Sequence, residues 1–127
     1  MDLTDISHHE FHKSEVSVIK LSHDGNLVAS GDSSKNIYIW SSTKKEIVNN
    51  RFVFHSAKVN DIAWFEDDTK LASASLDRSA IVWSIADKSR IKTFSDIDVE
   101  NVIAVSFEND KEIIVGGHSC CLSKLKF

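Results

Sequence analysis

The sequence predicts an all-β protein made of three consecutive four-stranded sheets, the blades of part of a larger β-propeller. The main observation is a repeat of 43 residues, because residues of one kind return at this interval. The recurring sets are Val16, Val59 and Val102; Ile19, Ile62 and Val105; Leu21, Trp64 and Phe107; His12 and His55; and Trp40 and Trp83. A period of about 40 to 45 residues is that of one propeller blade. Residues 1–127 are therefore divided into predicted repeats at 1–40, 41–83 and 84–127.

Each repeat is predicted to contain short strands separated by polar turns. The third strand of each repeat is apolar at nearly every position, as in Ile37-Tyr38-Ile39-Trp40, and this predicts burial on both faces. In the first repeat, the first three strands are expected at 15–21, 27–31 and 36–40. In the second repeat they are expected at 59–64, 71–75 and 80–83, and in the third at 102–107, 113–116 and 122–125. Fourth, more polar strands are expected at 46–50 and 89–93, with a counterpart at 3–7.

Composition narrows the class of protein. Of the 127 residues, 42% are hydrophobic and 27% are charged, as in ordinary globular domains. No apolar run approaches the roughly 18 residues of a membrane-spanning helix, and the first residues lack the layout of a secretion signal. The formal net charge of −4 argues against nucleic-acid binding, which needs a basic face. The two cysteines, Cys120 and Cys121, are adjacent and offer no disulfide framework, so a reducing cytosolic or nuclear setting is expected.

Two clusters contain the residue types that bind metals. They are His8, His9, Glu10 and His12, and His118, Cys120 and Cys121. Neither cluster has the two separated ligand pairs of a structural zinc site, and no phosphate-binding or dinucleotide motif is present. We therefore expect no metal, no cofactor and no catalytic residue. The acidic turns at Asp67-Asp68 and at residues 96–100 could be solvated loops or an acidic partner surface.

The stretch from residue 55 to residue 83, HSAKVNDIAWFEDDTKLASASLDRSAIVW, resembles a WD repeat that ends in Val-Trp-Ser instead of Trp-Asp. The resemblance implies a buried network in which His55 bonds Ser73 and Asp77, and Ser73 accepts the indole N–H of Trp83. A buried tryptophan N–H and a buried histidine each need a hydrogen-bond partner. The same residues could form a hydrolase triad, but nothing resembles a nucleophile elbow or an oxyanion hole.

The network residues differ between the repeats. The first repeat keeps His12, Ser30 and Trp40 and has Ser34 in the slot of Asp77. The slots of the third repeat hold Asp98, Val115, Ser119 and Leu125. We therefore expect the middle repeat to form the most rigid blade and the third to depend on apolar packing.

Three blades do not close a ring, because closure takes about four to eight. We expect the repeats to be the last three of a larger, seven-bladed propeller. Alone, the chain would expose the apolar faces of its end blades, and such patches drive association. The isolated chain is therefore expected to self-associate, as a dimer that completes a six-bladed ring, with residues 3–7 of each copy supplying the outer strand missing from the other.

Two segments are similar to the C-terminal repeats of the actin-interacting protein 1 family. They are EVSVIKLSHDGNLVASGDSSKNIYIW at 15–40 and FHSAKVNDIAWFEDDTKLASASLDRSAIVW at 54–83. The resemblance implies a cytoplasmic, cytoskeletal protein of two joined propellers that binds actin filaments decorated with cofilin and promotes their disassembly, without covalent chemistry. It carries over no partner-binding residue, so that surface is left open. The alternative is a generic WD scaffold for a ubiquitin ligase, trafficking or chromatin complex.

Overall fold

The computed structural model describes residues 11–95, 97, 102–117 and 122–127, and its regular structure there consists of β-strands alone. These strands form three antiparallel sheets. The first sheet contains β1 (Val16–Leu21), β2 (Leu27–Asp32), β3 (Ile37–Ser41) and β4 (Ile47–Phe52). The second contains β5 (Val59–Trp64), β6 (Lys70–Ser75), β7 (Ala80–Ser84) and β8 (Ser89–Phe94). The third contains β9 (Val102–Asn109), β10 (Glu112–Gly117) and β11 (Leu122–Lys126).

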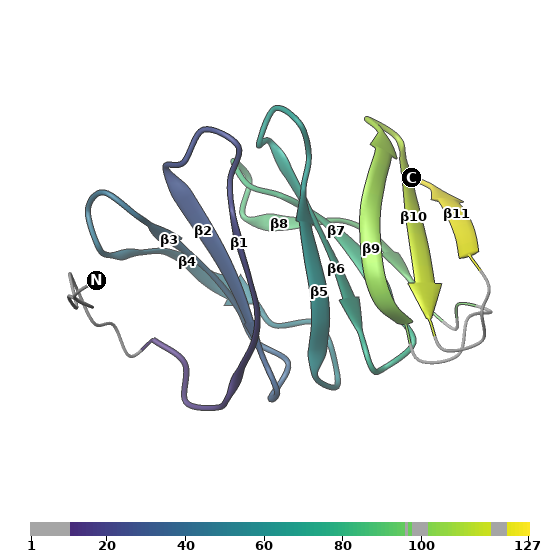
Figure 1. Ribbon diagram of the computed structural model, residues 1–127, viewed down its shortest axis with the longest axis horizontal. Coiled ribbons are helices and arrows are strands. Elements are labelled where there is room, and N and C mark those ends of the chain that lie inside the picture. Colours follow the sequence, from purple (N-terminus) through teal and green to yellow (C-terminus); the bar gives the residue numbers. More distant parts are fainter. Residues whose placement is uncertain (1–10, 96, 98–101, 118–121) are drawn as a thin grey trace, which may run out of the picture.

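The three sheets stand face to face in chain order, like consecutive blades (Figure 1). Strands β1, β5 and β9 lie beside one another, and β4 approaches β8 at the opposite edge. Within each sheet the strands follow one another in sequence, so every pairing is antiparallel and local. This arrangement confirms the predicted all-β blades, and the observed strand ends lie within about two residues of the predicted ones.

The apolar core consists of two layers, one between each pair of neighbouring sheets. Trp83 and Ile81 face the first layer, whereas Val82 faces the second, because successive side chains of a strand point to opposite faces. The predicted burial of third strands on both faces is correct for β7, where these three residues are fully buried. It is wrong for β3 and β11, since Trp40 is only half-buried and Leu122 is 78% exposed. The reason is that, among the described residues, the first and third sheets have a neighbouring sheet on one face only.

Polar contacts join neighbouring blades at equivalent repeat positions. Ser17 donates to the carbonyl of Val59, and one repeat later Asn60 Nδ2 donates to the carbonyl of Val102 at 2.7 Å. Asp61 also accepts the Val105 N–H at 3.0 Å. These bonds fix the height of each blade against the next, and they recur because the sequence repeat places the same strand position at each junction.

No helix in the part of the chain that the structure describes is long and apolar enough to cross a membrane.

Candidate functional site

The polar residues predicted in the middle repeat meet inside the second blade. His55, which lies just before β5, places Nε2 at 2.7 Å from the Oγ of Ser73 in β6. The indole N–H of Trp83 in β7 donates to the same Oγ at 2.9 Å. On its other side, His55 Nδ1 lies 3.2 Å from Asp77, in the turn between β6 and β7. The structure therefore brings all four residues together.

The Asp77 carboxylate collects several donors. It accepts the backbone N–H groups of Ser56 at 2.8 Å and Ser79 at 2.9 Å, and also the Ser79 hydroxyl. Burial by itself would raise the pKa of Asp77, but the hydrogen bonds from His55, Ser79 and Ser56 outweigh it and hold the pKa well below its ordinary value. Asp77 is therefore ionised at neutral pH. Ser79, whose hydroxyl also lies 3.0 Å from His55 Nδ1, is a member of the network that the sequence pattern did not reveal.

One proton arrangement satisfies the whole network. With neutral His55 protonated on Nδ1, the ring donates to Asp77, and its Nε2 accepts the Ser73 hydroxyl proton. The Ser73 oxygen then accepts the Trp83 N–H. These contacts have the order of a hydrolase triad, but Ser73 and Trp83 are fully buried and His55 is 2% exposed. Because no substrate can reach the hydroxyl, the geometry suits a structural clamp between strands β6 and β7, the turn that joins them and the segment before β5.

The first blade contains a related network with a different carboxylate. His12 Nε2 lies 2.6 Å from Ser30 Oγ, and His12 Nδ1 lies 2.8 Å from Oδ2 of Asp32. Ser34 stands at the position of Asp77 in the repeat, but the carboxylate that reaches the His12 ring is that of Asp32, two residues earlier. Asp32 also accepts the N–H groups of Ser34 and Asn36 at 2.9 Å each. Burial would raise the pKa of Asp32, but these N–H groups and His12 hold it below its ordinary value.

Aromatic contacts complete the first blade. The ring of Tyr38 stacks on His12 with centroids 4.5 Å apart, and the Trp40 ring lies 5.6 Å from that of Phe11. Both contacts lie on the face of the first sheet that points away from the second sheet, since the alternate residues Ile37 and Ile39 face the core. Residues 11 and 12 therefore cover part of a face that has no neighbouring sheet in the described structure.

The third blade replaces the network with apolar contacts where it is described. Val115 is fully buried and Leu125 packs against the same core layer. Asp98 and Ser119 lie outside the described residues, as do the acidic residues near position 100 and both cysteines.

The acidic turn at residues 67–68 connects two blades. Asp68 accepts the N–H of His23 at 2.9 Å and the N–H of Asp24 at 3.0 Å, and it lies 2.8 Å from His23 Nδ1. Burial would raise the pKa of Asp68, but these donors hold it below its ordinary value. Asp67 instead bonds Thr69 within its own turn. The Asp68 side chain is only 11% exposed, and its carboxylate already accepts these hydrogen bonds. This favours a structural role for Asp68 over a role in an open acidic surface.

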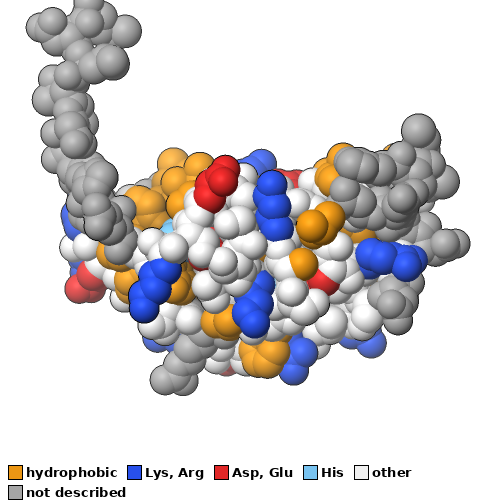
Figure 2. Space-filling view, turned by 90° about the horizontal axis from the view of Figure 1, so that it is seen from below, with side chains coloured by type: hydrophobic (Ala, Val, Ile, Leu, Met, Phe, Trp, Pro, Cys, Tyr) orange, Lys and Arg blue, Asp and Glu red, His pale blue; other side chains and the backbone are white. Residues whose placement is uncertain are grey.

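Among the described residues, no three metal-ligating side chains gather at one point. His8, His9, Glu10 and His118 lie outside those residues. Among the described residues on the face seen in Figure 2, apolar, basic and acidic side chains are interspersed and form no single charged patch. A groove lies elsewhere, between β8 and β11.

Sequence comparison matches the family model described as "WD domain, G-beta repeat" at residues 3–41 and 48–84. The chain belongs to the WD40 repeat family. The resemblance predicted from the 43-residue period is therefore confirmed, and WD40 domains serve as protein-interaction modules.

Solved WD40 propellers share the fold. The β-propeller domain of Myceliophteria thermophila Cps50 (Swd1) aligns with a TM-score of 0.83 at 15% identity, over 91% of this chain and 35% of that one. The WD40 repeats of RRP9 align with a TM-score of 0.81 at 17% identity, over 92% of this chain and 37% of that one.

Curated relatives are similar over most of the WD40 chain. Actin-interacting protein 1-2 from Arabidopsis thaliana is 29% identical over 120 residues, which cover 93% of this chain and 20% of that protein. WD repeat-containing protein 1 from Bos taurus is 26% identical, over 88% of this chain and 19% of that protein. Protein HIR1 from Eremothecium gossypii is 31% identical, over 76% of this chain and 13% of that protein. The chain therefore spans a fifth or less of the length of these relatives.

Proposed function

We propose that these blades are a non-enzymatic interaction module of an actin-interacting protein that works with cofilin to promote actin filament disassembly. The observation that carries the proposal is the similarity to Actin-interacting protein 1-2, which extends over 93% of the chain. The module acts in the cytoplasm, on the cytoskeleton. Its mechanism is binding that shifts the stability of the filament, without a covalent step.

The buried polar networks support a binding role. The hydroxyl of the triad-like set has no access to solvent, because Ser73 and Trp83 are fully buried. Their hydrogen bonds instead hold strands and turns in fixed positions, which is what a rigid docking platform requires. A pre-organised surface loses less conformational entropy when a partner binds.

The proposal also places residues 1–127 within a larger, seven-bladed propeller. Three sheets leave one face of the first and one face of the third without a neighbour, and Ile19 and Leu21 are 58% and 60% exposed on the first. Further blades of the same kind would bury these side chains, as the second sheet does for both its neighbours.

Co-sedimentation with actin filaments tests the function. The longest natural protein that contains these repeats is mixed with filaments alone, with filaments plus cofilin, and with buffer to control for self-pelleting. We expect pelleting that increases with cofilin, together with faster loss of polymer. Equal pelleting with and without cofilin, or none, contradicts the actin role.

A general WD scaffold is the alternative function, and the 31% identity to Protein HIR1 favours it. Affinity purification of the same tagged protein separates the two candidates. Recovery of actin with cofilin supports the first, and recovery of a stable complex without actin supports the second.

A further inference from the structure

The outer strands of the first and second sheets border a groove on the side of the molecule. One hollow of about 440 Å³ is lined by residues 47–50 of β4 and by Lys88. A second hollow of about 380 Å³ is lined by Phe54, Lys88, Ser89 and Arg90. Because Lys88 lines both hollows, they adjoin and form one groove, here called the β4–β8 groove. Both sheets contain all four strands, so this groove does not depend on a further blade.

Phe54 gives the β4–β8 groove an exposed aromatic wall. Its side chain is 54% exposed, although the ring contacts that of the buried Trp83 with centroids 5.9 Å apart. The residue at the equivalent position of the next repeat, Ile97, is only 5% exposed. The fold can therefore bury this position, so the repeat does not require an exposed phenyl ring at residue 54. Aromatic side chains of this kind are frequent contact residues in protein interfaces.

Arg90 stacks on the Phe54 ring. Its Cζ atom lies 3.9 Å from the ring centroid, and one guanidinium N–H donates to the Thr93 hydroxyl at 3.3 Å. A stacked guanidinium keeps a fixed plane, and its N–H groups point outward along the edge of that plane, where they match the two oxygens of a carboxylate. Basic residues on an edge strand often serve only to prevent pairing. A guanidinium held on an exposed ring is a more specific arrangement, and it suits the recognition of an anion.

The lining of the β4–β8 groove is positively charged. Among the described residues, Lys88 and Arg90 are its charged members, and neither forms an ion pair there. Asp87 precedes Lys88 in sequence, but its carboxylate accepts the Ser84 hydroxyl within its own turn. Nucleic acid fits poorly, because the chain has a net charge of −4 and a phosphate backbone needs many cations. Two cations beside an aromatic ring instead suit one carboxylate with an apolar neighbour.

The shape of the β4–β8 groove favours an extended segment. The groove follows residues 47–50 and then reaches Phe54, and the edges of β4 and β8 that have no partner strand among the described residues offer backbone groups for hydrogen bonding. We propose that this groove binds an extended acidic segment of a partner protein. A carboxylate of the segment pairs with Arg90 and Lys88, and a neighbouring apolar side chain packs against Phe54. The proposal does not depend on the actin role, because it concerns the chemistry of the groove alone.

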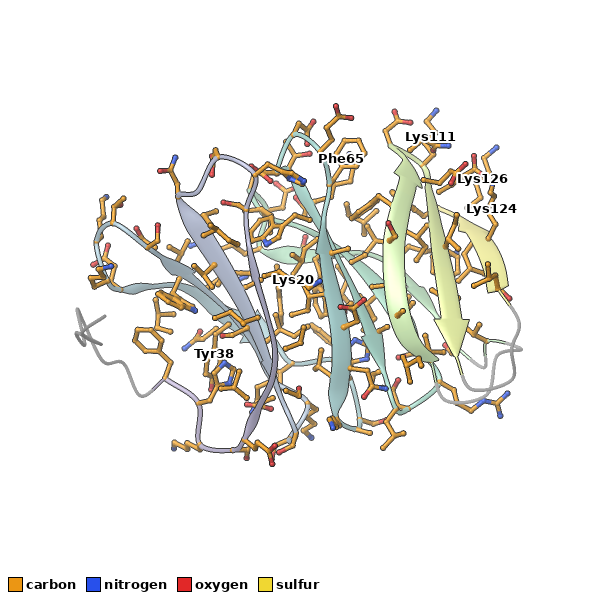
Figure 3. The ribbon with its side chains drawn as sticks, in the orientation of Figure 1. Lys20, Tyr38, Phe65, Lys111, Lys124 and Lys126 are labelled. Carbon is orange, nitrogen blue, oxygen red and sulfur yellow. The ribbon has the colours of Figure 1, made fainter. Side chains whose placement is uncertain are left out.

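Selection from a library of random short peptides displayed on phage tests the proposal, with the 127-residue chain as the immobilised target. We expect the selected peptides to contain aspartate or glutamate next to an apolar residue. In fluorescence anisotropy, the double variant K88E/R90E should bind these peptides at least about tenfold more weakly than the unaltered chain, because attraction is replaced by repulsion. The matched control K111E changes an exposed lysine in the turn between β9 and β10, on the third sheet and away from the groove (Figure 3). It should bind the peptides as the unaltered chain does.

Nuclear magnetic resonance of the unaltered chain gives a second measurement that does not depend on variant folding. A selected peptide should shift the Arg90 Nε–H signal and the backbone amide signals of residues 47–50, 54 and 88–90. Replacing the acidic residues of the peptide by lysines should abolish binding to the unaltered chain and restore binding to K88E/R90E. Failure to select any peptide overturns the proposal. So do selected peptides without acidic residues, equal binding by K88E/R90E, or shifts confined to other residues.

Discussion

At the scale of single residues, the His55 network shows how one hydroxyl can serve two buried partners. Ser73 Oγ lies within hydrogen-bonding distance of both His55 Nε2 and Trp83 Nε1, and neither ring has access to water. An unpaired polar group in such a place costs about 1 to 3 kcal/mol, which is more than a typical hydrogen bond contributes. Removing the shared hydroxyl therefore affects two groups at once.

We expect Ser73→Ala to lower the free energy of unfolding by about 2 to 4 kcal/mol, because it leaves the Trp83 N–H and the His55 Nε2 without their shared partner. Urea denaturation followed by tryptophan fluorescence measures the change. Ser89→Ala, on the exposed strand β8, is the matched control and should change stability by less than about 0.5 kcal/mol. Equal effects of the two substitutions would show that the network contributes little.

The lowered pKa of Asp77 makes the free energy of unfolding depend on pH in the acid range. A carboxyl whose pKa is lower in the folded state than its ordinary value of 3.8 contributes stability above that value, and this stability is lost as the pH falls through the folded pKa. The urea midpoint of the unaltered chain should therefore drop between about pH 5 and pH 2.5. In Asp77→Asn the midpoint should be lower at pH 7 and should fall less over that interval. Glu66→Gln, which removes an exposed carboxylate, serves as the control.

The residues of these networks differ in how far a sequence pattern marks them. His55, Ser73 and Trp83 could be predicted because the 43-residue period gave their positions and burial gave them a need for partners. Asp32 could not, since the period puts Ser34 in the carboxylate slot and the conformation of the turn decides which side chain reaches the ring. Asp68 was ambiguous for another reason. Its partners are two backbone N–H groups and the His23 side chain, in a turn 44 to 45 residues earlier, and no local pattern reveals such a contact.

At the scale of elements, the junction between the first two blades depends on close approach of β2 and β5. A Cβ atom built on Gly31 would lie 2.7 Å from Val59 Cγ1 and 2.9 Å from Val59 Cβ, which is inside van der Waals contact. Glycine is needed at position 31 because a larger residue would collide with Val59. The strands themselves could be predicted, because alternating apolar residues and polar turns mark them, but a spacing between sheets leaves no such signal.

We expect Gly31→Ala to destabilise the chain by about 1 to 3 kcal/mol through overpacking against Val59. The double variant Gly31→Ala/Val59→Ala supplies the test, because alanine at 59 removes the Cγ1 atom 2.7 Å from the added methyl group, although the contact with Cβ at 2.9 Å remains. The two single changes together should therefore cost less than the sum of their separate costs, as measured by urea denaturation. Strict additivity would mean that the two residues do not compete for space.

At the scale of the whole molecule, the blades differ in how many of their faces are covered. The second sheet lies between the other two and contributes to both core layers, while the third has one covered face. Strands β6 and β10 allow a fair comparison, because each is flanked by a hydrogen-bonded strand on both edges. Their backbone pairing is alike, and the coverage of their faces is the main difference.

Hydrogen exchange should therefore be slower in β6 than in β10. Residues 71–75 are all buried, whereas Ile114, Gly116 and Gly117 are only half-buried, so opening β6 exposes more apolar surface to water. We expect β6 amides to exchange at least about tenfold more slowly, as measured by mass spectrometry on peptides from the 127-residue chain. Strand β11 is left out of this prediction, because the exchange of its amides would depend on whether the groove between β8 and β11 is occupied. If β10 exchanged as slowly as β6, the free face of the third sheet would have to be covered, and dilution below the dissociation constant of any two-copy species would then restore the difference.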